Sequence, residues 1–147
     1  MGWLDPYRGK LVGFDTAPLI YFIEEHARFL PLVRPLFEAA QSSGVRLVTS
    51  SITLVEVLVQ PIRRGRLELA EQYRDVLTNT EGIQLVSLSE QIAEHAATLR
   101  AQYALRTPDA IQLATAKVSG VAVFITNDEQ FAKTDFNVII LNQLPVC

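Results

Sequence analysis

The sequence has little of the chemistry on which several classes of protein depend. It contains one cysteine, Cys147, and two histidines in 147 residues. A single cysteine excludes an intramolecular disulfide and a thiolate cluster that could hold a metal. The apolar runs are far shorter than the roughly 20 residues that a membrane-spanning helix needs. There is no glycine-rich phosphate-binding loop of the Walker or dinucleotide type.

The overall composition is that of a compact soluble protein. Hydrophobic residues make up 49% and charged residues 20% of the chain, which separates it from disordered sequences. A chain of this length can bury roughly 70% of its unfolded surface, so we expect one domain over residues 1–147. The first ten residues, MGWLDPYRGK, lack the apolar core of a signal peptide. We therefore expect a cytoplasmic protein with no membrane association.

The net charge of −3 is unusual for a nucleic-acid-binding protein, which typically shows a basic face. The average hides a local excess of positive charge, because Arg63, Arg64 and Arg66 lie within one short segment. Acids that gather around a metal also lower the net charge. The charge alone therefore excludes no function.

Apolar segments of strand and helix length alternate along the chain. Strands are expected over about 10–15, 45–49, 83–86, 121–125 and 138–141, and helices over about 17–25, 31–43, 51–60, 66–79, 89–104 and 107–118. Thr16 is expected to cap the first helix, Gly44 to end the second, Pro61 to end the third and Thr107 to cap the last. Such alternation predicts a three-layer α/β/α fold with a five-stranded, mainly parallel sheet.

Four acids occupy special positions in this scheme: Asp15, Glu56, Asp109 and Asp128. Asp15 and Asp128 each follow a predicted strand directly, and Glu56 lies early in the helix after the second strand. Strand ends and the starts of the helices that follow them share one edge of a parallel sheet, where ligands bind. Asp109, in a first helical turn, can reach the same edge. We therefore predict that the four carboxylates converge.

Glu56 is the acid hardest to explain structurally. It lies within the apolar run LVEVLV, where an unpaired buried charge would be costly. Carboxylates brought close together repel each other, and a divalent cation removes that penalty. Ligands that are all oxygen favour Mg²⁺ or Mn²⁺ over zinc.

Each acid also has a plainer interpretation. Asp15 could be only a helix cap, Asp109 an acid favoured by the helix dipole, and Asp128 a turn residue. Glu56 could pair with Arg63 or Arg64. Arg63, Arg64 and Arg66 could form an ordinary solvated turn instead of contacting phosphates.

The motifs that carry these acids resemble the PIN domain family over nearly the whole chain. They are FDTAPLI with Asp15, TLVEVL with Glu56, TPDAIQLATA with Asp109 and FITNDEQF with Asp128. By length and motif the chain is most similar to the VapC-type toxin ribonucleases of toxin–antitoxin pairs. It departs from the family pattern at Ala17 and Pro18, where many members carry another small polar residue.

The resemblance implies Mg²⁺- or Mn²⁺-dependent cleavage of RNA by the four acids. Thr16 and Thr126 match the hydroxyl residues that support the first acid and the metal. Arg63, Arg64 and Arg66 would contact RNA phosphates. The resemblance also implies a homodimer and an antitoxin protein, whose helix would pack on surplus apolar residues of the first two helices, such as Ile20, Phe22, Ile23 and Leu30.

Other classes of protein fit less well. A receiver domain needs paired acids after its first strand and a late lysine, and the chain offers Phe14 before Asp15 and no lysine after Lys133. A phosphatase with a nucleophilic aspartate needs a second acid where Ala17 stands. The remaining alternative is a PIN-like module that binds RNA or protein without cleaving it.

Overall fold

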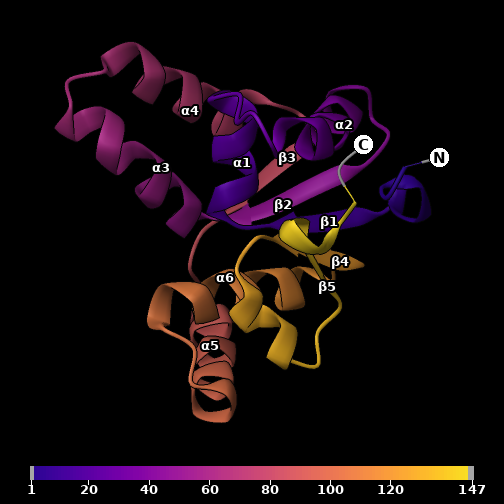
Figure 1. Cartoon of the computed structure of the whole chain (residues 1–147). Helices are drawn as coiled ribbons and strands as arrows, with labels where there is room; N and C mark the ends of the chain where they lie inside the picture. Colours follow the sequence, from indigo (N-terminus) through magenta and orange to yellow (C-terminus); the bar gives the residue numbers. More distant parts are fainter. Residues whose placement is uncertain (1, 146–147) are drawn as a thin grey trace.

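A parallel sheet of five strands forms the centre of the protein (Figure 1). The computed structural model describes residues 2–145, so Cys147 lies outside the described part. The strands are β1 (Leu11–Phe14), β2 (Arg46–Ser50), β3 (Ile83–Val86), β4 (Val123–Thr126) and β5 (Val138–Ile140), in the order β3-β2-β1-β4-β5. Each neighbouring pair is parallel. The expected α/β fold is confirmed, and the sheet is parallel throughout.

Helices cover both faces of the sheet. They are α1 (Thr16–Ile23), α2 (Leu30–Gln41), α3 (Ser51–Arg63), α4 (Leu67–Asn79), α5 (Glu90–Tyr103) and α6 (Thr107–Ser119), with short 3₁₀ segments η1 (Asp5–Tyr7), η2 (Glu129–Lys133) and η3 (Leu141–Gln143). The apolar residues of α1, α2 and α4 form one buried cluster, and those of α5 and α6 form a second cluster on the other face. Figure 1 shows these two groups of helices above and below the sheet. No helix within residues 2–145 is long and apolar enough to cross a membrane.

Helix α3 does not end at Pro61, as the sequence predicted, but continues to Arg63. A proline removes one hydrogen bond to the preceding turn, and here the loss falls in the last turn of the helix. The following turns are closed by backbone bonds from Arg64 to Gln60 and from Arg66 to Pro61, at 3.0 and 2.8 Å. The two helices α3 and α4 therefore form a long hairpin that extends away from the sheet (Figure 1).

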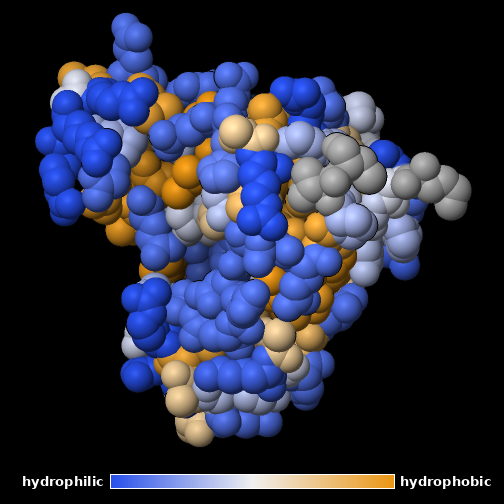
Figure 2. Space-filling view, viewed as in Figure 1, coloured by the Kyte–Doolittle hydropathy of each residue, from blue (hydrophilic) through white to orange (hydrophobic). Residues whose placement is uncertain are grey.

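The expectation that Glu56 lies on a buried face is wrong. Only one stripe of α3 is buried, made of Thr53, Val57 and Pro61, because the hairpin projects from the sheet and packs along one side alone. Glu56 is exposed. Several apolar side chains of the hairpin are exposed too: Val55, Val59, Ile62 and Leu67. Orange areas along the hairpin mark apolar surface in Figure 2.

Three helix ends differ from the prediction. After α2, Ser43 takes the left-handed backbone conformation that often follows the last turn of a helix. The backbone N–H of Gly44 then bonds to the carbonyl of Ala39 at 2.7 Å. Helix α2 therefore ends at Gln41, without Gly44 in that role. Asp15, not Thr16, holds the N-cap position of α1, and Arg106, not Thr107, holds that of α6.

The apolar residues of α1 and α2 are mostly used in packing. Leu19, Phe29 and Leu32 are buried. The side chains expected to bind an antitoxin are partly buried against the same cluster: Ile20, Phe22, Ile23 and Leu30. These side chains thus fill the space between the two helices and the sheet. The strongly exposed apolar side chains lie on α3 and α4 instead.

Candidate active site

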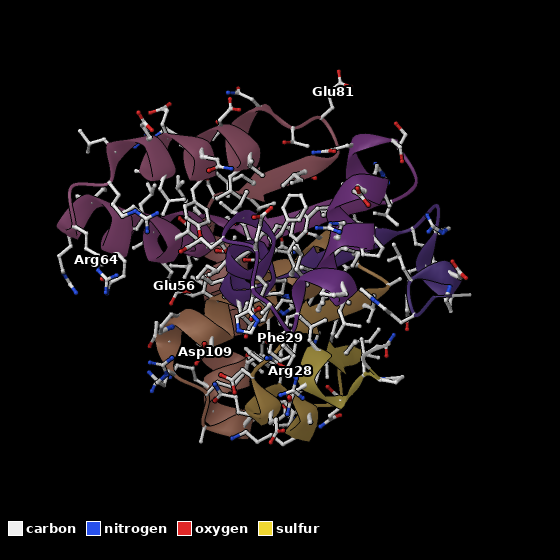
Figure 3. All side chains as sticks on the ribbon, turned by 45° about the horizontal axis from the view of Figure 1, so that its top comes forward. Arg28, Phe29, Glu56, Arg64, Glu81 and Asp109 are labelled. Carbon is white, nitrogen blue, oxygen red and sulfur yellow. The ribbon has the colours of Figure 1, made fainter. Side chains whose placement is uncertain are left out.

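The four predicted acids line one cavity of about 590 Å³. It lies at the edge of the sheet where β1, β2 and β4 end. Asp15 follows β1, Glu56 stands in α3 after β2, Asp109 lies in the first turn of α6, and Asp128 follows β4. Figure 3 shows Glu56 and Asp109 on the same side of the molecule, projecting from α3 and α6. The convergence inferred from strand ends is present in the structure.

Asp15 is the innermost acid. Its Oδ2 accepts a hydrogen bond from the hydroxyl of Thr126 at 2.6 Å, while its Oδ1 is buried with no hydrogen-bond partner. No backbone N–H of α1 bonds to its carboxylate, although Asp15 holds the N-cap position. A role as a simple helix cap therefore does not explain this side chain.

Burial raises the pKa of Asp15 from 3.8 to about 7, and the negative charges of Asp128, Asp109 and Glu56 add to the rise. The hydrogen bond from Thr126 acts in the opposite direction but is outweighed. An unpartnered buried carboxylate oxygen is costly when charged. A cation placed beside Oδ1 would remove both the desolvation and the repulsion.

Glu56 is held by a chain of polar side chains below the cavity. The hydroxyl of Thr16 donates to Oε1 of Glu56 at 2.5 Å, and Nε2 of Gln112 donates to the same hydroxyl at 3.3 Å. Gln112 also donates to Thr53 at 2.9 Å, and Thr53 lies 2.7 Å from the hydroxyl of Thr49. Thr49, Thr53 and Gln112 are buried, so the orientation of an exposed acid is set by a buried network.

Asp109 and Asp128 are joined by Gln130. Its Nε2 donates to Oδ2 of Asp109 at 2.9 Å and to Oδ2 of Asp128 at 2.6 Å. Asp109 also pairs with the exposed Arg106 at 3.1 Å. The backbone N–H of Gln130 bonds to Oδ1 of Asp128, so Asp128 caps η2 in addition to lining the cavity. The turn interpretation of Asp128 is thus confirmed but does not account for its second oxygen.

The donors around the cavity suit a hard divalent cation, because five carboxylates, the four predicted acids and Glu129, line it and no histidine, cysteine, lysine or arginine does. In the described residues no three acidic, histidine or cysteine side chains are yet grouped closely enough to ligate one ion. Glu56 is bonded to Thr16, and Asp109 and Asp128 are bonded to Gln130, so these three carboxylates are held by protein donors. The carboxylates would have to move closer together to share one cation, and Oδ1 of Asp15, which has no hydrogen-bond partner, is available as a ligand.

The three arginines lie away from the cavity, at the far end of the α3–α4 hairpin, and all are exposed. Figure 3 shows Arg64 at that end, on the side of the hairpin from which Glu56 projects. Across residues 2–145 the ion pairs are Arg8–Asp5, Arg74–Glu71 and Arg106–Asp109. The alternative in which Glu56 pairs with Arg63 or Arg64 is therefore wrong.

Sequence reasoning missed the polar residues that hold the acids. Gln112 and Gln130 lie within the motifs TPDAIQLATA and FITNDEQF, and the motifs assign neither of them a role. One signal was available for Gln112, since a glutamine between Ile111 and Leu113 in an apolar helix would be buried. Gln130 gave no such signal, because its role depends on how η2 approaches α6.

The fold and the acid-lined cavity together define a PIN-type nuclease architecture. A family model described as "PIN domain" matches residues 13–137. The chain belongs to the PIN domain family, as its motifs predicted.

Solved structures with similar folds come from toxin–antitoxin systems. A chain of a toxin–antitoxin complex from Klebsiella pneumoniae is 27% identical, with a TM-score of 0.69 over 90% of this chain and 99% of that one. A chain of VapBC-1 from nontypeable Haemophilus influenzae is 25% identical, with a TM-score of 0.58 over 90% of this chain and 99% of that one.

A third structure supports the fold alone. VapC20 of Mycobacterium tuberculosis, a toxin that cleaves the sarcin–ricin loop, is 15% identical, with a TM-score of 0.69 over 85% of this chain and 95% of that one. A search of curated protein sequences gives no match. The family is one of ribonucleases that use divalent metal ions and occur in toxin–antitoxin systems.

Proposed function

We propose that this chain is a metal-dependent endoribonuclease whose catalytic residues are Asp15, Glu56, Asp109 and Asp128. The observation that carries the proposal is the arrangement of four carboxylates around one cavity with Oδ1 of Asp15 buried and unpartnered. A protein that only binds RNA gains nothing from such a cluster. Carboxylates repel phosphates, and neighbouring carboxylates disfavour each other's ionised form.

Asp15 and Asp109 would hold Mg²⁺ or Mn²⁺ directly, and Glu56 and Asp128 would act through water. A bound divalent cation would supply Lewis-acid polarisation of the phosphodiester and activation of water. Thr126 keeps Oδ2 of Asp15 oriented and leaves Oδ1 without a hydrogen-bond partner, available to a cation. Thr16 holds Glu56 at the cavity edge, where its carboxylate can orient the attacking water.

The direct test is RNA cleavage by the purified protein with Mg²⁺ or Mn²⁺, compared with EDTA. Cleavage should disappear in EDTA and in Asp15→Asn, which keeps the shape of the side chain. Asp135→Asn is the matched control, because this exposed acid lies outside the cavity, and it should retain full activity. RNA binding without cleavage under either metal would refute the nuclease and favour the non-catalytic binding module.

We further propose that the chain is the toxin of a toxin–antitoxin pair and acts in the cytoplasm. The complex from Klebsiella pneumoniae described above supports this assignment. Expression of the chain alone should arrest growth, and Asp15→Asn should not. If a small protein is encoded beside this chain, its co-expression should restore growth. Growth arrest by Asp15→Asn equal to that by the native chain would contradict the proposal.

The chain is also proposed to form one domain over residues 1–147 and a homodimer. Sedimentation equilibrium of the purified protein measures the mass in solution directly. A mass of twice 16.4 kDa is expected, and a monomer across the accessible concentration range would refute the dimer.

A further inference from the structure

The side chain of Gln130 places one neutral amide between two of the four acids. Its Nε2 carries two N–H groups, and these donate to Oδ2 of Asp109 at 2.9 Å and to Oδ2 of Asp128 at 2.6 Å. The two acids come from different elements, because Asp109 lies in α6 and Asp128 caps η2. The amide thus links two elements through carboxylates that the proposed nuclease uses.

The backbone that carries Gln130 is fixed, while its side chain is not enclosed. The next residue, Phe131, is fully buried, and its ring centroid lies 5.3 Å from that of Phe124. The backbone N–H of Gln130 bonds to Oδ1 of Asp128 at 3.1 Å. The side chain itself is half-buried. It can therefore leave the two carboxylates by a change of rotamer, without a change in the backbone.

The contacts of Gln130 differ in kind from those of Gln112. Gln112 is buried, and its amide donates to the hydroxyls of Thr16 and Thr53, so it is part of the framework below the cavity. Within residues 2–145 the side-chain amide of Gln130 bonds to two carboxylates and to no other group. Its position therefore depends on what else those carboxylates bind.

A cation and this amide compete for the same carboxylates. Both neutralise the negative charge of Asp109 and Asp128, so each weakens the binding of the other. They also need the same space, because Mg²⁺ lies about 2.1 Å from its ligand oxygens and keeps several waters around it. Nε2 of Gln130 occupies that space, 2.9 Å from one carboxylate and 2.6 Å from the other.

We propose that Gln130 is a gate on the metal site, whose amide must rotate away from Asp109 and Asp128 before these acids hold a cation. This inference rests on the proposed nuclease function and deepens it, because it makes activity depend steeply on the concentration of free divalent cation. A site that binds only after opening has its apparent affinity reduced by the open fraction of molecules. If about one molecule in ten is open, the reduction is tenfold.

The first test measures Mn²⁺ binding without RNA, from the electron paramagnetic resonance signal of free Mn²⁺ at pH 8. Gln130→Met keeps the length of the side chain and removes both N–H donors. It should bind Mn²⁺ roughly tenfold more tightly than the native chain, because only the closed state loses hydrogen bonds to charged groups. Gln143→Met is the matched control and should bind as the native chain does. Gln143 is exposed, lies in η3 and does not line the cavity.

A second measurement uses the native chain, so it does not depend on how the variant folds. The side-chain amide of Gln130 gives a pair of ¹H–¹⁵N NMR signals, assigned through the backbone signals of the same residue. Hydrogen bonds to two carboxylates slow the exchange of these protons with water. Saturating Mg²⁺, which is diamagnetic, should move both signals toward the positions of a solvated glutamine and speed their exchange.

The outcomes distinguish the gate from the nuclease. Binding of Mn²⁺ by Gln130→Met that is no tighter than that of the native chain would overturn the gate and make Gln130 a brace or a ligand of the ion. Amide signals of Gln130 that keep their positions and exchange rates in saturating Mg²⁺ would overturn it too. The nuclease proposal survives both results if the native chain cleaves RNA with metal. Absence of Mn²⁺ binding in native chain and variant alike would refute both proposals.

Discussion

The raised pKa of Asp15 makes a quantitative prediction about stability. The shift from 3.8 to about 7 corresponds to roughly 4 kcal/mol, at about 1.4 kcal/mol per pKa unit. The folded protein holds a proton on Asp15 that the unfolded chain has lost between these two pH values. The free energy of unfolding should therefore fall as pH rises from about 4 to 7, and the full penalty should remain above pH 7.

Asp15→Asn removes this titration. With the same two pKa values, the free energy of unfolding of the native chain should fall by about 3 kcal/mol between pH 5 and pH 8. The free energy of unfolding of the variant lacks this dependence. The variant also leaves a buried amide N–H unpaired, which costs about 1–3 kcal/mol at every pH. In EDTA at pH 8 the variant should therefore be as stable as the native chain or more so. At pH 5, where only about 1.7 kcal/mol of the native penalty is present, the two proteins should be within about 1.5 kcal/mol of each other.

Urea unfolding at both pH values, with and without Mn²⁺, measures these differences. Mn²⁺ should stabilise the native chain at pH 8 and have little effect at pH 5, because binding must displace the proton from Asp15. It should stabilise Asp15→Asn far less at either pH. A difference between the two proteins that does not change with pH would refute the reasoning, whatever its sign.

Three other changes test single features of the structure. A Cβ on Gly82 would lie 2.1 Å from a backbone carbonyl oxygen of α2. Gly82→Ala should therefore lower the free energy of unfolding in urea by about 3 kcal/mol or more, and a loss below about 0.5 kcal/mol would contradict the close approach. Gln112→Glu replaces the amide donor by an acceptor and should draw the Thr16 hydroxyl away from Glu56, which lowers kcat with KM little changed. An equal loss of kcat in Gln112→Met would instead indicate a packing role for Gln112. Arg64→Ala should weaken RNA binding equally for all sequences and reduce its salt dependence, and binding with an unaltered salt slope would exclude a phosphate contact.

The sequence was sufficient to predict the order of elements and the meeting of the four acids. That prediction needed only the rule that parallel strands end at one edge, applied to Asp15 and Asp128 directly after apolar runs. It failed for the burial of Glu56, because the run LVEVLV does not reveal that α3 leaves the sheet. Pro61 was misjudged for a related reason, since the cost of a proline depends on how near the helix end it falls.

Local sequence patterns could not predict the residues that orient the acids. Gln112 contacts Thr16 across 96 positions of sequence, and Gln130 reaches Asp109 across 21. Each contact depends on the packing of two elements whose spacing no sequence period encodes. Tyr21 is similar, because its neighbours in the chain are apolar and only the fold places its ring at the cavity.

The order β3-β2-β1-β4-β5 places the first strand at the middle of the sheet, between β2 and β4. The last acid, Asp128, follows β4, so the cluster is incomplete until this late segment has been synthesised and has paired with β1. A chain emerging from the ribosome therefore exposes at most three of the four carboxylates for most of its translation. The topology therefore orders the site in time: the four acids can meet only after β4 has been made and has paired with β1.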